Sequence, residues 1–344
     1  MINLVDMAEM GILPDSIIRY GIRKRLKVTL KQLSSPNSKI EDQKRLNWIE
    51  ELSNSPVAIV PEKANEQHYE LPPDFFQTVL GENLKYSGGF WPNGNNTLDE
   101  SEAEMLRLTC FRAELEDDQD ILELGCGWGS LTLWMAEHYP NSRIKAVSNS
   151  HAQRTYIIHQ AELHGLNNVE VITADMNDFS TSEHFDRVVS VEMFEHMRNY
   201  KVLMNRIEKW LKPQGKLFVH IFTHDKYGYP YLDQGEKDWM ARYFFTGGQM
   251  PSHDLLPEFK QNMDHEKSWI VDGINYAKTS RAWLDKMDNN RQQIMAIFEK
   301  TYGKNNALVW FGRWRLFFMA CEELFRYNGG KEWYISHYLF SKGN

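Results

Sequence analysis

The stretch Asp120–Tyr139, DILELGCGWGSLTLWMAEHY, contains the pattern that decides the fold. Its first five residues form a short apolar run that predicts a buried strand, and its second half predicts an amphipathic helix. Between them stand Gly125, Gly127 and Gly129, which let the backbone turn sharply and approach a ligand closely. The loop amides and the first turn of the helix would point at that ligand, so the stretch predicts a cofactor site. The helix face that we expect to be buried consists of Leu131, Trp134, Met135 and His138.

The spacing of the glycines narrows the choice of cofactor. A dinucleotide fingerprint has the pattern G-x-G-x-x-G and an acidic residue about 20 positions later. Here the pattern is G-x-G-x-G, and the next predicted strand ends in Val147–Ser150, which offers Asn149 and no carboxylate. With Glu123 two positions before the first glycine, the stretch instead resembles motif I of the class I S-adenosylmethionine (SAM) methyltransferases. A tight strand–helix turn without a ligand is the alternative.

Composition excludes several classes of protein. The chain has 39 basic and 47 acidic residues and a formal net charge of −8, which argues against broad nucleic-acid binding. Its cysteines, Cys110, Cys126 and Cys321, are far apart and form no C-x-x-C pair, so neither a disulfide framework nor a metal site is expected. There is no apolar run of membrane-spanning length and no leader pattern, so we expect a cytoplasmic protein without stable membrane insertion.

Two parts are expected along the chain. Residues 1–66 are predicted to be a helical extension, and residues 67–344 the ligand-binding domain, with a core at 118–222, cap insertions at 223–330 and a closing strand at 333–342. The extension contains a basic amphipathic helix. Contact with an anionic membrane is one interpretation of this helix, but we favour packing of its apolar face on its own protein. Its basic residues are Arg19, Arg23, Lys24, Arg25, Lys27 and Lys31.

Strand–helix alternation continues from Asp120 onward. It predicts an α/β fold of the Rossmann-like type, with a mostly parallel seven-stranded sheet, the N-terminal helical extension and a helical cap. Ligands in such sheets bind beyond the carboxyl ends of the strands, where the polar groups should converge. After the first strand, the predicted strands are Arg143–Ser148, Val169–Asp175, Phe185–Met197 (running into a loop), Lys216–Phe222, Ser268–Ala277 and Trp333–Lys342.

Three groups of polar residues follow these predicted strands. Asp175 ends the third strand and can accept a hydrogen bond from an exocyclic amine such as that of adenine, or else cap the next segment. Glu192, Glu195 and His196, in VEMFEHM, can shift one another's pKa toward neutrality, which suits a base that removes a proton from an amine or hydroxyl nucleophile. His220 lies on the fifth strand and either faces the site or is a core histidine.

Several segments together give a more specific resemblance, which runs from about Gln67 to the end of the chain. The segments LKYSGGFW, ILELGCGWGSL, AVSNSHAQRTYI, TADMNDF, FDRVVSVEMFEHM and FFMACEELFRYNGGKEWYISHYLF resemble the cyclopropane-fatty-acyl-phospholipid synthase superfamily. Within it, they are most similar to the coclaurine N-methyltransferase-like branch. The resemblance implies a class I SAM-methyltransferase fold.

The resemblance also implies roles for individual residues. Tyr86, Ser87 and Gly125 would hold the methionine part of SAM, with Gly127 in the same loop. The remaining cofactor contacts would come from Asn149 and Gln153 to the ribose, and from Asp175 and Met176 to the adenine. In the alkaloid N-methyltransferases the E-x-x-E-H motif acts on the substrate amine, and here its residues are Glu192, Glu195 and His196.

Cyclopropane synthases use a different arrangement, in which a bound bicarbonate removes a proton after methyl transfer to an alkene. Its ligands include a Cys just after Tyr-Ser, the Glu of F-E-H and a His on strand five. This chain has Gly88 at the Cys position and keeps Glu195 and His220. It also has Glu192 where the synthases usually carry Gly, so the implied bicarbonate site is incomplete and crowded by a carboxylate.

These observations predict an enzyme that transfers the methyl group of SAM to a small acceptor and releases S-adenosyl-L-homocysteine (SAH). We favour an amine nitrogen, with Glu195 and His196 taking the proton, Glu192 pairing with the cationic amine, and His220 completing the catalytic set. A lipid-modifying activity such as cyclopropanation is the alternative, and a SAM-binding module without catalysis is a third interpretation. No nucleic-acid partner is expected, and a homodimer is one option for the assembly.

Overall fold

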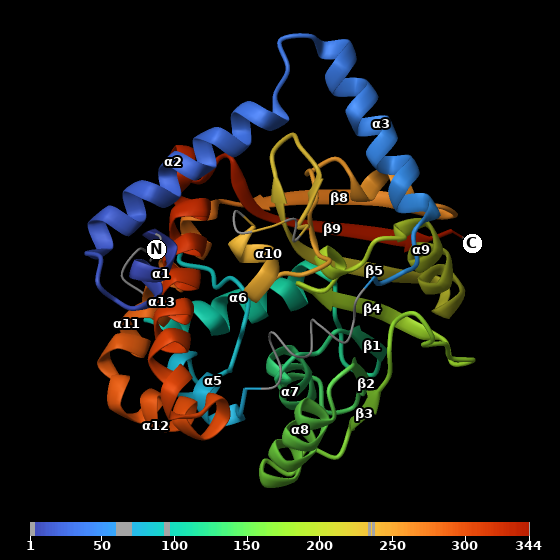
Figure 1. The fold of residues 1–344 in the computed structure, drawn as a ribbon. Helices are drawn as coiled ribbons and strands as arrows, with labels where there is room; N and C mark the ends of the chain where they lie inside the picture. Colours follow the sequence, from blue (N-terminus) through green and yellow to red (C-terminus); the bar gives the residue numbers. More distant parts are fainter. Residues whose placement is uncertain (1–3, 60–70, 93–96, 233–234, 236–237, 344) are drawn as a thin grey trace.

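The computed structural model describes residues 4–59, 71–92, 97–232, 235 and 238–343 (Figure 1). A seven-stranded sheet forms the centre of the molecule. Its strands are β1 (Asp120–Leu124), β2 (Arg143–Ser148), β3 (Val169–Thr173), β4 (Phe185–Val191), β5 (Leu211–His224), β8 (Met263–Val271) and β9 (Trp333–Lys342). Their order is β3-β2-β1-β4-β5-β9-β8, in which the first five are parallel and β9 runs antiparallel to both of its neighbours. The predicted α/β fold with a mostly parallel seven-stranded sheet is confirmed.

Helices connect the parallel strands. They are α7 (Ser130–His138), α8 (His151–Leu163) and α9 (Tyr200–Trp210). β1 and β2 are buried along nearly their whole length, as their continuous apolar sequences require in a sheet covered on both faces. The carboxyl ends of β1 to β4 therefore meet at one edge, which is where the ligand site was expected.

The structure corrects two local predictions. The buried face of α7 consists of Leu131, Thr132, Met135 and Ala136, whereas the predicted member His138 is exposed and stacks on Trp134 with ring centroids 4.1 Å apart. The predicted strand Ser268–Ala277 is wrong in its second half. β8 ends at Val271 because the side chain of Asp272 accepts a hydrogen bond from the backbone N–H of Ile274 and caps a helix there.

A helical cap covers one end of the sheet (Figure 1). It is formed by α5 (Pro73–Val79), α11 (Gly273–Asn289), α12 (Arg291–Tyr302), α13 (Lys304–Arg326) and the 3-10 turn η3 (Tyr327–Gly330). The cap has an aromatic core, in which Phe75 lies 4.8 Å from Trp314 between ring centroids, and Trp283 lies 5.7 Å from Phe318. Much of the aromatic content of the chain therefore serves packing.

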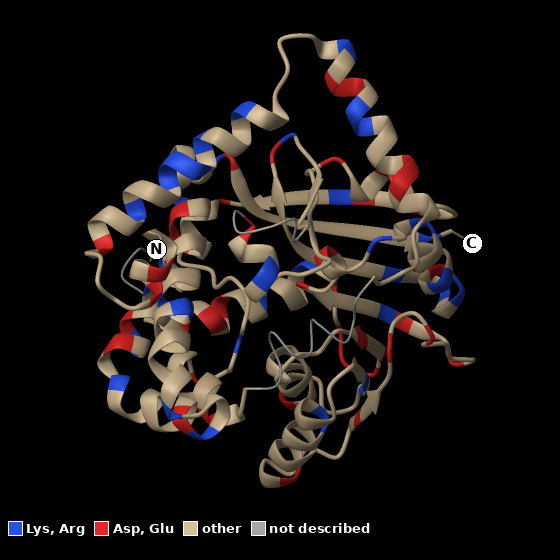
Figure 2. Cartoon of the chain, in the orientation of Figure 1, with Lys and Arg blue, Asp and Glu red and all other residues tan. Residues whose placement is uncertain are grey.

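The N-terminal extension contains α1 (Leu4–Glu9), α2 (Asp15–Leu33) and α3 (Ser38–Asn54). Lys and Arg residues follow one another along α2 (Figure 2). Ile18 of α2 is buried and Ile22, Leu26 and Leu30 pack against the same apolar cluster, so the interpretation that the apolar face packs on its own protein is confirmed. Arg19 also binds Glu322 at 2.7 Å and Glu323 at 3.0 Å, and Arg23 binds Glu323 at 2.9 Å. The proposed boundary at 66/67 lies outside the described residues. Within the described ranges, no helix combines the length and the apolar character needed to cross a bilayer.

The remaining elements are short or connect the parts already named. They are α6 (Leu98–Arg112), η1 (Phe194–His196), β6 (Tyr229–Pro230), α10 (Trp239–Tyr243), β7 (Gln249–Met250) and η2 (Leu256–Phe259). α6 begins with a capping box made by Thr97 and Glu100, which fixes the entry of the chain into the core. η1 contains Glu195 and His196, so these predicted residues lie in a short 3-10 turn between β4 and α9.

Candidate active site

The glycine loop after β1 has the conformation that its sequence requires. Gly125, Gly127 and Gly129 have φ angles of 80°, 52° and 83°, in the left-handed region that favours glycine. A Cβ atom at Gly125 would lie 2.6 Å from the side chain of Met193, and one at Gly129 would lie 2.6 Å from Ile157. A Cβ atom at Gly127 would meet open space. Two of the glycines therefore serve close packing, and the third faces an opening.

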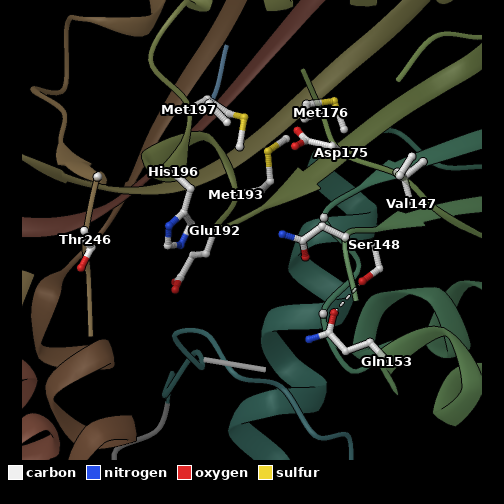
Figure 3. Close-up of a pocket in the computed structure, with 16 residues that line it drawn as sticks. Val147, Ser148, Gln153, Asp175, Met176, Glu192, Met193, His196, Met197 and Thr246 are labelled. Carbon is white, nitrogen blue, oxygen red and sulfur yellow. Dashed lines mark hydrogen bonds between the residues drawn. The ribbon is translucent and has the colours of Figure 1, made fainter. Parts of the chain in front are cut away.

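That opening is a cavity at the carboxyl ends of β1 to β4, with an empty volume, its mouth included, of about 760 Å³ (Figure 3). The main chain around it comes from the loops after each of these strands, as expected for an α/β sheet. The cavity brings together most of the predicted site residues: Gly125, Gly127, Asn149, Gln153, Asp175, Met176, Glu192 and His196. Glu192 and His196 lie on one side of it, and Ser148 and Gln153 on the other (Figure 3).

The side formed by Ser148, Gln153 and Asp175 is suited to hold SAM. The hydroxyl of Ser148 donates to Oε1 of Gln153 at 2.7 Å, which leaves the amide nitrogen of Gln153 buried and without a hydrogen-bond partner among the described residues. Asp175 accepts a hydrogen bond from the backbone N–H of Asn177 through Oδ1 at 2.7 Å and also lines the cavity. A buried donor without a partner requires a ligand or water. An amide donor, a carboxylate and an open glycine backbone match the ribose and adenine of SAM.

The opposite side is centred on Glu192. This residue has a φ of 47°, an unfavourable conformation for a residue with a side chain. Its Oε1 accepts from the backbone N–H of Gly88 at 3.1 Å and lies 3.3 Å from Nε2 of His220. Its Oε2 accepts from the hydroxyl of Tyr276 at 2.7 Å. Several donors thus converge on one carboxyl group, whose side chain is only 9% exposed.

Burial dominates the electrostatics of this side. It raises the pKa of Glu192, while the charge of buried Lys85 and the hydrogen bonds from Tyr276 and Gly88 lower it. It also holds the pKa of His220 well below its usual range, with the positive charges of Lys85 and Arg112 adding to the effect. His220 is therefore neutral near pH 7. The hydrogen bonds that Glu192 accepts from Tyr276 and Gly88 favour its ionised form.

The structure places the other predicted residues around the cavity but not among its lining. Glu195 is buried, burial and the charge of Glu192 raise its pKa well above its ordinary value, and its Oε2 has no partner among the described residues. The helix that follows, α9, is capped by Asn199, whose side chain accepts from the backbone N–H of Val202. Tyr86 packs on Phe76 and Trp283, next to Ser87, which accepts a hydrogen bond from Lys85. Their predicted roles remain predictions.

Sequence reasoning missed Tyr276, Lys85 and His337. Tyr276 is separated from Glu192 by 84 positions and was assigned to a strand, although it lies on α11. Lys85 lies within the quoted LKYSGGFW segment, but nothing in the sequence around it marked it as buried. His337 shares a face of β9 with Ile335 and Leu339, which indicated only that its side chain could point inward. Each of these residues reaches the site through tertiary contacts.

Comparison with known proteins agrees with the geometry. The sequence matches the mycolic acid cyclopropane synthetase family over residues 59–333. It is 35% identical to the (S)-coclaurine N-methyltransferase of Thalictrum flavum subsp. glaucum, over 99% of this chain and 96% of that protein. The cyclopropane-fatty-acyl-phospholipid synthase of Escherichia coli (strain K12) is 26% identical over 95% of this chain and 77% of that protein.

Solved structures lead to the same relatives. A crystal structure of coclaurine N-methyltransferase bound to N-methylheliamine and SAH has a TM-score of 0.95 and 34% identity to this chain, and covers 98% of this chain and 99% of that one. The fold is thus that of the class I SAM methyltransferases, and SAM is the cofactor. The resemblance inferred from the sequence motifs is confirmed: the chain belongs to the mycolic acid cyclopropane synthetase family, on a branch that includes the coclaurine N-methyltransferases.

Proposed function

We propose that this SAM-dependent methyltransferase transfers a methyl group to the nitrogen of a small amine. The observation that carries the proposal is the position of Glu192, a carboxyl group aimed into the cavity and held there by donors. The relatives named as N-methyltransferases, and the one solved with N-methylheliamine and SAH, support an amine acceptor.

Glu192 suits an amine because the nitrogen becomes cationic as it is methylated. A fixed carboxylate in a cavity shielded from water stabilises a charge that develops next to it, at no cost of reorganisation. An alkene also becomes cationic when it is methylated, but its carbon carries no N–H that could donate a hydrogen bond to the carboxylate. The residue is held at a φ of 47°, a conformation that a glycine would adopt without strain. Backbone strain kept at a cavity-lining position favours a functional role for the side chain.

Different residues of the cavity would bind SAM, bind the acceptor and remove its proton. Gln153 and Asp175 would hold the ribose and adenine of SAM, which when bound supplies an electrophilic methyl group on a sulfonium sulfur. Glu192 would orient the acceptor and bind its cationic form. A neutral amine is the nucleophile, so its proton needs an acceptor. His196 lines the cavity beside Glu192 and would take that proton, with Glu195 as a second candidate.

Lipid modification is the second candidate function. The chain keeps Glu195 and His220, which the cyclopropane synthases use, and it shares 26% identity with one of them. The position of Glu192 argues against this activity, because its carboxyl group occupies the place expected for the bicarbonate. It accepts a hydrogen bond from the N–H of Gly88 and lies next to His220. A Cβ atom at Gly88 would also collide with Ile335, so this packing leaves little room for a cysteine at that position.

The test uses methyl-labelled SAM with two acceptors in parallel, vesicles of an unsaturated phospholipid and a panel of primary, secondary and tertiary amines. We expect label in the amine fraction and none in the lipid fraction. Because N-methylation and cyclopropanation both add one CH2, the products have to be separated by phase rather than by mass alone. Label found only in the lipid phase would make lipid modification, and not amine methylation, the function that the experiment supports.

A further inference from the structure

A chain of side chains leads from the surface of the molecule to Glu192. Nη1 of Arg112, at the end of α6, lies 2.8 Å from Nδ1 of His337. Nε2 of His337 lies 2.9 Å from Nδ1 of His220, which faces it across the antiparallel pair β5–β9. Nε2 of His220 then lies 3.3 Å from Oε1 of Glu192. Both histidines are fully buried, and Arg112 is partly exposed.

The guanidinium group of Arg112 sets the direction of every hydrogen bond in this series of side chains. A guanidinium group donates hydrogen bonds and cannot accept them, so Nδ1 of His337 must be the acceptor. A neutral His337 then carries its proton on Nε2 and donates to Nδ1 of His220. His220 in turn carries its proton on Nε2, which points at Glu192. Burial lowers the pKa of both rings well below the usual range, so each ring carries a single proton near neutral pH.

We propose that Arg112 and His337 are positioning residues that lock His220 in the tautomer donating to Glu192, and so hold Glu192 as an ionised carboxylate. The functional part of this inference rests on the proposed binding of an amine cation by Glu192. In this direction the chain is not a path for removing the substrate proton. His220 presents a hydrogen rather than a lone pair to Glu192, and Arg112 has no site to receive a proton at the other end.

Other groups near Glu192 do not belong to the hydrogen-bonded series Arg112–His337–His220. Lys85 is a buried cation that donates to the carbonyl of Gly88 at 3.0 Å, and Tyr276 donates its hydroxyl to the carboxylate. Burial and the charge of Glu192 raise the pKa of Glu195 well above its ordinary value, which favours the neutral form of Glu195. Burial raises the pKa of Cys321 above its ordinary value, which leaves a neutral thiol. His196 lines the cavity next to Glu192. His220 and His337 are the imidazoles linked to Arg112 by hydrogen bonds, so Arg112 controls which of their ring nitrogens donate and which accept.

The test changes Arg112, because a partly exposed residue is more tolerant of substitution than the buried rings. Arg112→Glu removes the donor and places an acceptor at this end of the chain, acting directly or through a water. Arg112→Met removes the donor alone, and Arg112→Lys keeps a cation that only donates. The matched control is Arg107→Glu, which makes the same charge reversal on the same helix at a side chain that is 68% exposed.

Histidine-selective 15N NMR reads the tautomers directly, with His337→Gln used to assign the two rings. In the parent we expect His220 to be protonated on Nε2 and unprotonated on Nδ1, and we expect Arg112→Glu to exchange these states. The acid limb of the pH profile of kcat/KM for the amine should then move to higher pH. We expect activity on that limb to fall on the order of 10-fold for each unit of displacement. Arg112→Lys and Arg107→Glu should match the parent, and Arg112→Met should lie between.

Two results would overturn the proposal. One is a parent protein in which His220 carries its proton on Nδ1, and the other is unchanged ring nitrogens in both Arg112→Glu and Arg112→Met. Because the NMR measurement needs no acceptor, it separates this inference from the proposed function. If the tautomers exchange as expected while the parent methylates no amine, the positioning role stands and the choice of acceptor is wrong.

Discussion

The two sides of the cavity are built in different ways. The cofactor side is formed by consecutive strand–loop–helix units, and its polar residues lie between Gly125 and Met176. The acceptor side is formed around Glu192 by Gly88 from a loop, His220 from β5 and Tyr276 from α11. One side is encoded in contiguous sequence, whereas the other exists only after the cap and the antiparallel strands have been placed on the sheet. SAM binding and acceptor choice should therefore respond separately to mutation.

Two buried carboxyl groups show the same contrast. Glu123, in β1 just before the glycine loop, accepts a hydrogen bond from the hydroxyl of Thr132 at 2.5 Å, and burial raises its pKa to about 7. Glu192 accepts hydrogen bonds from Gly88 and Tyr276, with the positive charge of Lys85 nearby. Burial raises the pKa of both groups, but it is opposed by one hydroxyl at Glu123 and by two donors and a nearby cation at Glu192.

The largest expected effect comes from Glu192. We expect Glu192→Gly and Glu192→Gln to lower kcat for an amine by about 100- to 1,000-fold, because the stabilisation of the developing cation is lost. The Kd for SAM should stay unchanged, as measured by isothermal titration. Glu192→Gly should not lower the thermal midpoint, since it relieves a backbone strain that costs on the order of 1 kcal/mol. A weakened SAM affinity in both variants would mean that the two sides are not independent.

The same pair of variants allows a rescue experiment. Glu192→Gly leaves the N–H of Gly88, the hydroxyl of Tyr276 and the imidazole of His220 around an opened space. Formate or acetate added at millimolar concentration should occupy it and restore part of the amine methylation. Glu192→Gln fills that space with its own side chain and should not respond, which makes it the matched control. Equal responses of the two variants would show that the anion acts elsewhere.

Proton removal is the next expected effect. We expect His196→Ala to lower turnover by about 100-fold, since it removes the proposed base from the cavity. We expect Glu195→Gln to lower turnover by at most about 10-fold, because Glu195 does not line the cavity. Both should bind SAM as the parent does. If the two losses are reversed in size, Glu195 is the base, and if neither variant loses activity, the E-x-x-E-H motif does not remove the proton.

The comparison of the two sides also explains what the sequence could predict. The glycine loop, Asn149 and Asp175 were found because strand–helix alternation places them at the carboxyl ends of parallel strands. That rule depends on local periodicity alone. The partners of Glu192 follow no such rule. Tyr276 was misassigned to a strand because the Asp272-Gly273 pair, which ends β8 and caps the next helix, has apolar residues on both sides and was not recognised as a turn.

A further prediction concerns stability and Glu123. Its pKa is about 7 in the folded protein and 4.5 in an unperturbed side chain, so between these values the folded state binds more protons than the unfolded state. Stability therefore falls as the pH rises from 4.5 to 7, by about 3 kcal/mol in total. Glu123→Gln should remove that loss. Denaturant unfolding should give equal stability at pH 4.5 and a more stable variant at pH 8, and a difference that does not depend on pH would contradict the prediction.

The smallest expected effect tests the cofactor side itself. Gln153→Ala removes the buried amide nitrogen that has no partner among the described residues, and a hydrogen bond of this kind contributes about 0.5 to 1.5 kcal/mol. We expect the Kd for SAM and for SAH to rise a few-fold, with the KM for the amine unchanged. Ser148→Ala should give a weaker effect of the same sign, because the Ser148 hydroxyl orients that amide. The double variant should then be no worse than Gln153→Ala, whereas fully additive losses would show that Ser148 contacts the cofactor independently.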